Sequence, residues 1–217
     1  MTIDAIDGKR LIEIFVAMDD AAGRDPIKRE HQILCVFGAA AILSYGSNTR
    51  QTQDIDVWRP ASRINERAIR QMANAAGLDY NPTELEPDRI YLQIVDDGVI
   101  RLPRYDQDEA VWSTGKPNEH VWSGDHITIV APPAEIVAAA KLVRGDPQDV
   151  EDVSFLMNAK GVSARDIAKA ISHFPAEKRE MARENMVFLG YPSVPEGHES
   201  SKRINPQNRG GRGGMGE

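Results

Sequence analysis

The sequence predicts an α/β (α+β) fold, in which a small mixed sheet is followed by a C-terminal helical bundle and a disordered tail. Apolar runs of strand length alternate with amphipathic helical segments as far as Ala131, whereas the periodic segments after it are all helical. After Tyr191 the apolar residues become too few to form a core. We therefore divide the chain into an α/β core at 1–131, a helical part packed on the core at 132–191 and a disordered tail at 192–217.

Glycines and capping residues mark the predicted ends of several helices and strands in residues 1–131. Gly38 follows five continuous apolar residues, a run typical of a strand buried on both faces. Ser62 is the expected N-cap of a longer helix, and Gly77 is its stop. Residues 96–98, Asp-Asp-Gly, indicate a β-hairpin. The predicted elements are a helix at 9–23, a strand at 33–37, a helix at 39–46, a strand at 54–58, a helix at 62–78, and strands at 89–95, 99–105 and 126–130.

Four helical segments fill the second half of the chain. Each begins at a proline or at a capping residue, and three of the four end at a glycine. These boundaries predict helices at 133–145, 147–161, 163–174 and 175–190. We expect them to form the bundle that packs on the α/β core.

Length, charge and cysteine content narrow the class of protein. The 217 residues are 41% hydrophobic and 27% charged, which is ordinary for a globular protein, and the net charge of −7 argues against coating nucleic acid by charge alone. Cys35 is the one cysteine, and a single cysteine excludes both a disulfide framework and a cysteine zinc site. It lies in an apolar run, as a buried small residue would. The N-terminus carries acids where a signal peptide carries basic residues, and no apolar run reaches membrane-spanning length. We expect a protein of the microbial cytoplasm with no membrane partner.

The two aspartates of the strand at 54–58 are the clearest chemical signal. Residues i and i+2 of a strand point to the same face, so Asp54 and Asp56 present adjacent carboxylates while Ile55 and Val57 point into the core. Adjacent carboxylates repel unless a cation lies between them. Mg²⁺ suits this role because it binds through one or two carboxylates plus substrate phosphate oxygens. Asp54 and Asp56 are therefore the predicted Mg²⁺ ligands.

Neighbouring residues supply groups that can bind the phosphates of a nucleotide. A glycine between a buried strand and a helix, here Gly38, leaves backbone N–H groups free to meet phosphate, and the small Ala39 keeps the approach open. Arg50 and Thr52 add a cation and a hydroxyl. Each signal alone is weak. A D-x-D pair by itself is more simply explained as a turn at the end of a strand, with no role in binding. The ordered set is far harder to explain by chance.

The segment 37–57 resembles the nucleotidyltransferases of the DNA polymerase beta type superfamily, whose minimal members carry a glycine turn, a helix and a D-x-D strand. The segment 135–156 looks like the bacterial branch associated with toxin–antitoxin and abortive-infection systems, in which a lysine helix precedes an R-x(4)-D-x-x-D stretch. The resemblance, which spans 33–156, implies Mg²⁺-dependent transfer of a nucleoside monophosphate from an NTP to a tRNA, another RNA, a protein or a small molecule. It also implies an antitoxin partner.

The resemblance assigns roles to individual residues. Asp54 and Asp56 would be catalytic metal ligands, and Lys141 would contact phosphate with Asp149 near the site. Read from the residues alone, Lys141 is equally well a solvated surface lysine of an alanine-rich helix. The implied nucleotide-binding set is Gly38, Ala39, Arg50, Thr52, Lys141 and Arg144.

The chain departs from the family pattern at two places. Relatives commonly have Gly-Gly or Gly-Ser where this chain has Gly38 and Ala39, a mild change that keeps a small residue. Fully active members usually place a third acid on a later strand, where this chain offers Gln93 and Arg101. Two hypotheses therefore stay open: an active enzyme with a reduced set of acids, and a catalytically inactive protein of the same fold that binds or regulates.

Overall fold

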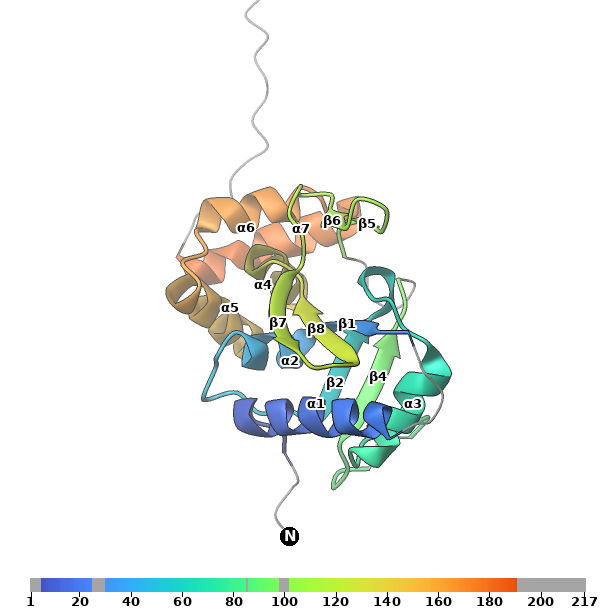
Figure 1. The fold of residues 1–217 in the computed structure, drawn as a ribbon. Helices are drawn as coiled ribbons and strands as arrows, with labels where there is room; N and C mark the ends of the chain where they lie inside the picture. Colours follow the sequence, from blue (N-terminus) through green and yellow to red (C-terminus); the bar gives the residue numbers. More distant parts are fainter. Residues whose placement is uncertain (1–4, 25–29, 85, 98–101, 191–217) are drawn as a thin grey trace, which may run out of the picture.

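The computed structural model describes residues 5–24, 30–84, 86–97 and 102–190, and within them the chain has a mixed α/β fold (Figure 1). The larger sheet has six strands in the order β3-β4-β2-β1-β8-β7, and β5 and β6 form a separate pair. The predicted tail at 192–217 lies outside the described residues. In chain order the elements are α1 (Gly8–Gly23), β1 (Gln32–Phe37), α2 (Gly38–Ser44), β2 (Asp54–Trp58), η1 (Arg59–Ala61), α3 (Glu66–Ala75), β3 (Asp79–Tyr80), β4 (Tyr91–Val95), β5 (Tyr105–Asp106), β6 (Val111–Trp112), β7 (Glu119–Ser123), β8 (Ile127–Ala131), α4 (Ala134–Arg144), α5 (Pro147–Ala159), α6 (Ala164–Ile171), α7 (Ala176–Asn185) and η2 (Met186–Leu189).

Strand β1 lies near the centre of the sheet and sets the position of the aspartate strand. It runs antiparallel to β2, with Phe37 opposite Asp56, and parallel to β8. Its residues Leu34, Cys35 and Val36 are fully buried, as a continuous apolar run predicts for a strand covered on both faces. The register therefore brings the C-terminal end of β1, and the glycine that follows it, against Asp56.

The prediction that Ser62 is the N-cap of α3 is wrong. The helix begins at Glu66, and Asn65 caps it by accepting a hydrogen bond from the Ala68 N–H at 3.1 Å. The Ser62 hydroxyl already donates to the Trp58 carbonyl at 2.6 Å and accepts from the Cys35 N–H at 2.9 Å. It therefore ties β1 to the end of β2 instead of capping the helix.

The predicted hairpin after β4 falls partly on residues 98–101, which lie outside the described residues. On the near side of that gap, β4 pairs in parallel with β2 and with β3, so both of its edges are occupied. On the far side, residues 102–104 are not part of a strand, and Tyr105 begins β5, which pairs with β6. The described part of 99–105 therefore does not extend the large sheet beside β4.

Helix α4 occupies the centre of the C-terminal helices. Helices α5, α6 and α7 all pack against it, and eight of its eleven residues are buried. Its alanines allow this because small side chains let neighbouring helices approach closely. Figure 1 shows these helices gathered on one side of the sheet, with α1 and α3 packed together on the other. None of the helices in the described part of the chain has both the length and the apolar character needed to cross a bilayer.

Candidate functional site

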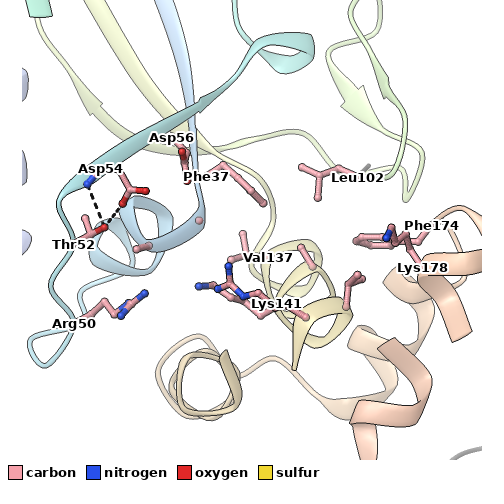
Figure 2. Close-up of a pocket in the computed structure, with 15 residues that line it drawn as sticks. Phe37, Arg50, Thr52, Asp54, Asp56, Leu102, Val137, Lys141, Phe174 and Lys178 are labelled. Atoms are coloured by element: carbon pink, nitrogen blue, oxygen red, sulfur yellow. Dashed lines mark hydrogen bonds between the residues drawn. The ribbon is translucent and has the colours of Figure 1, made fainter. Parts of the chain in front are cut away.

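A cavity of about 320 Å³ lies where β1, α2 and β2 meet the C-terminal helices (Figure 2). It brings together every site residue predicted from the sequence except Asp149. The cavity is lined by Phe37, Gly38, Ala39, Arg50, Thr52, Asp54, Asp56, Leu102, Val137, Ala140, Lys141, Val143, Arg144, Phe174 and Lys178.

The carboxylates of Asp54 and Asp56 form one wall of this cavity. Strand alternation turns both into it, whereas Ile55 and Val57 between and after them are fully buried in the core. Thr52 orients the first carboxylate, because its hydroxyl donates to an Asp54 carboxylate oxygen (Figure 2). Burial, together with the neighbouring Asp54 charge, raises the pKa of Asp56 to about 7, even though the Lys141 and Arg144 charges act in the opposite direction. The site therefore resists holding both negative charges without an added cation.

Gly38 makes the close approach of Asp56 possible. Its φ of +62° is in the left-handed region, and a Cβ atom there would lie 2.8 Å from Asp56 Oδ2. Any other residue would thus meet both a strained backbone and a steric clash. The helix that follows, α2, is only seven residues long, so its N-terminus contributes little field of its own. The attraction for a polyanion has to come mainly from side-chain cations.

Lys141 lies on the wall of the cavity opposite Asp54 and is 6% exposed, so the alternative that it is a solvated surface lysine is wrong. Its ammonium Nζ is 2.7 Å from Asp152 Oδ2 and 3.2 Å from Asp149 Oδ1. Asp152 is also buried, and its Oδ1 is 3.7 Å from Arg50 Nε. One carboxylate of α5 therefore lies within ion-pair range of two cations from distant parts of the chain, although the buried Arg50 Nε makes no hydrogen bond to it. Figure 2 shows Arg50 pointing toward Lys141.

Asp149 is fully buried and lies behind the cavity wall, where it fixes Arg144. Its two carboxylate oxygens accept hydrogen bonds from Arg144 Nε and Nη2, both at 2.6 Å. Burial alone would raise the pKa of Asp149, but the Arg144 hydrogen bonds and the Lys141 charge outweigh it and hold that pKa below its ordinary value. Asp149 is therefore ionised at neutral pH and acts on the cavity through Arg144 and Lys141.

The donor set of the cavity fits Mg²⁺ with a bound nucleotide. Among the described residues, no three or more His, Cys, Asp or Glu side chains are grouped so that they could hold a metal by themselves. Two carboxylates are enough for Mg²⁺, which takes its remaining ligands from water and substrate phosphates. The raised pKa of Asp56 beside Asp54 is the observation that supports this fit, because a divalent cation would relieve that repulsion. The β2–β4 register places Gln93 beside Asp56, so this position carries an amide and not a third carboxylate.

The apolar part of the cavity was not predicted from the sequence. Leu102 and Phe174, with Lys178 next to them, lie at the end remote from Asp54 (Figure 2). A second hollow of about 690 Å³ shares Leu102 and Phe174 with the first, so the two adjoin. These residues lack a common sequence motif, and only the packing of the C-terminal helices brings them together.

No protein-family model, curated protein or solved structure matches this chain. The chemistry of the cavity therefore carries the functional argument. Two carboxylates and four basic side chains line one hollow, an arrangement that can bind a polyanion together with a divalent cation.

Proposed function

We propose that this protein is a Mg²⁺-dependent nucleotidyltransferase, which transfers a nucleoside monophosphate from an NTP to an acceptor in RNA, protein or a small molecule. The observation that carries the proposal is the cavity in which Asp54 and Asp56 face Lys141 with Arg50 and Arg144. An acceptor hydroxyl oxygen forms a bond to the α-phosphorus, the bond from that phosphorus to the bridging oxygen breaks, and pyrophosphate leaves. The hydroxyl proton passes to solvent.

The acidic and the basic side chains of the cavity have different roles in the proposed reaction. Asp54 and Asp56 would hold Mg²⁺, which supplies neutralisation of phosphate charge when bound. Arg50 and Lys141 bind the phosphates that leave as pyrophosphate, and Arg144 adds a third positive charge to the same wall. Donors that are already fixed need little reorganisation when charge develops on the leaving group.

The buried acids of α5 keep those donors fixed. Asp149 pairs with Arg144 and Lys141, and Asp152 pairs closely with Lys141 and more distantly, at 3.7 Å, with Arg50. Without these two acids the three cations would repel one another and turn toward solvent. The R-x(4)-D-x-x-D stretch thus has a physical role in the proposed site, although neither acid lines the cavity.

Label transfer tests the proposal. Purified protein, Mg²⁺, a cell lysate and each NTP labelled at the α-phosphate are incubated together, and macromolecular and small-molecule products are separated. We expect Mg²⁺-dependent label in one product, and none with Asp56→Asn. Asp146→Asn is the matched control, because Asp146 is an exposed acid that pairs with the exposed side chain of Arg144 at the rim and does not line the cavity. Equal transfer by Asp56→Asn and the wild type would refute the site.

A second candidate function is a binding or regulatory protein that does not catalyse transfer. The observation in its favour is Gln93, which occupies the place beside Asp56 where a third carboxylate would help to deprotonate the acceptor. Calorimetry combined with the label assay separates the two candidates. Mg²⁺-dependent NTP binding without transfer to any acceptor supports the regulatory protein, and transfer of label excludes it.

The proposal extends to a role as the toxin of a toxin–antitoxin pair, on the resemblance of residues 135–156. Expression of the wild-type chain in a bacterial host should then arrest growth. Asp54→Ala should relieve the arrest because it removes one predicted Mg²⁺ ligand. Arrest of equal strength by the Asp54→Ala variant would contradict the toxin role, and co-expression of a neighbouring small gene would identify an antitoxin.

A further inference from the structure

The end of the cavity remote from the two aspartates has the composition of a site for a flat, apolar ring. Leu102 and Phe174 line it, on the side away from Asp54 (Figure 2). Apolar side chains do not stabilise phosphate, but they stabilise a nucleobase through packing and aromatic stacking. An NTP that places its phosphates against Arg50 and Lys141 therefore has its base at this end.

One cationic side chain, Lys178 of α7, accompanies these apolar residues. Its Nζ lies 3.5 Å from Glu177 Oε1 and 3.9 Å from the Met181 sulfur. The first partner is a largely exposed carboxylate and the second is a poor acceptor, so neither contact uses the donors of the ammonium well. Lys178 therefore has N–H groups available to a ligand in the cavity.

An ammonium group donates hydrogen bonds and accepts none, which makes it selective among bases. Guanine, uracil and cytosine each carry a carbonyl oxygen that can accept from it. Adenine has no carbonyl: it accepts only through ring nitrogens, and its N1 and N7 lie beside an exocyclic amino group that is itself a donor. At this edge of adenine the amino group faces the ammonium donor to donor, whereas a carbonyl in the same place accepts from it, and the unmatched donors are costly in a partly buried site.

We propose, resting on the nucleotidyltransferase function above, that this end of the cavity binds the nucleobase and that Lys178 favours nucleotides whose base carries a carbonyl oxygen over adenine nucleotides. ATP is then the weakest of the four common NTPs at this site. The preference comes from one charged hydrogen bond, whose loss in a partly buried site changes affinity by about tenfold or more.

Inosine triphosphate and ATP give the sharpest test, because ITP carries a ring carbonyl where ATP carries an amino group. Titration calorimetry of the full chain with Mg²⁺ should give a Kd for ITP about tenfold below that for ATP. Lys178→Met should remove the difference, and Lys178→Arg should keep it because the guanidinium also only donates. Lys9→Met is the matched control, because Lys9 is an exposed lysine of α1 whose side chain is 86% exposed.

The outcomes separate this inference from the proposed function. Equal affinity for ITP and ATP in the wild type, or a preference that persists in Lys178→Met, overturns the base-site inference alone. Weaker binding of tripolyphosphate by Lys178→Met also overturns it, since Lys178 would then be a phosphate ligand. If the wild-type protein with Mg²⁺ binds neither NTP, the nucleotidyltransferase proposal fails and the inference fails with it.

Discussion

Replacing Asp56 with asparagine should stabilise the metal-free protein at alkaline pH while it abolishes transfer. Burial, together with the Asp54 charge, raises the pKa of Asp56 from 3.8 in its ordinary state to about 7 in the fold. Between these two values the folded protein holds a proton that the unfolded chain has lost. Stability of the wild type therefore falls as the pH rises through this window.

The size of the effect follows from the two pKa values. With 3.8 for the unfolded chain and about 7 for the fold, linkage gives a loss of about 1.7 kcal/mol by pH 5 and about 4 kcal/mol by pH 8, relative to the fully protonated state. Asparagine does not titrate, so the variant has no such loss. The stability difference between Asp56→Asn and the wild type should therefore grow in favour of the variant by about 2.5 kcal/mol from pH 5 to pH 8.

Urea unfolding of both proteins at several pH values, in the presence of a chelator, measures this difference. Mg²⁺ with a nucleotide serves as the internal control, because a ligand that binds only the folded state should stabilise the wild type at pH 8 and leave Asp56→Asn unchanged. A stability difference that is the same at pH 5 and pH 8 would refute the reasoning. So would equal stabilisation of the two proteins by Mg²⁺ and nucleotide.

Three further substitutions test other contacts of the cavity. Gly38→Ala should lower the free energy of unfolding by about 1–2 kcal/mol for its left-handed backbone alone, and should weaken Mg²⁺-dependent NTP binding because the new Cβ displaces Asp56; unchanged unfolding and binding would contradict this. Asp149→Asn should cost about 3–5 kcal/mol in urea unfolding because it removes the fully buried carboxylate that pairs with Arg144 and with the buried Lys141, whereas the exposed Asp146→Asn should cost less than about 1 kcal/mol, and equal costs would count against the buried network. Arg50→Met should raise the calorimetric Kd for NTP about tenfold or more, and an unchanged Kd would remove Arg50 from the phosphate site.

Local periodicity was enough to predict the aspartate wall of the cavity. The alternation of Asp54, Ile55, Asp56 and Val57 fixes which side chains enter the core and which leave it, and the structure agrees for all four residues. Gly38 was also identifiable, since a buried strand that stops at glycine is a local pattern. The cap of α3 was missed because a serine hydroxyl bonds equally well to other backbone groups, and its partners are set by tertiary contacts.

The opposite wall was harder to predict because it depends on how helices pack. A lysine in an alanine-rich helix is usually exposed, and Lys141 is buried only because Asp149 and Asp152 pair with it. Their spacing of three residues puts both acids on one face of α5, so a signal was present in the sequence. Nothing local indicates that Lys178 reaches the same cavity, since helical periodicity identifies the buried face of α7 and not its neighbour.

The separation in sequence between the two walls also sets when a newly synthesised chain can form the cavity. The aspartates leave the ribosome first, whereas Lys141 follows more than eighty residues later and Lys178 later still. A nascent or prematurely terminated polypeptide can therefore carry Asp54, Asp56 and Arg50 without Lys141 and Arg144, which line the same cavity in the finished protein. An incomplete molecule therefore lacks the complete cavity, and we expect it to be unable to carry out the proposed nucleotide transfer.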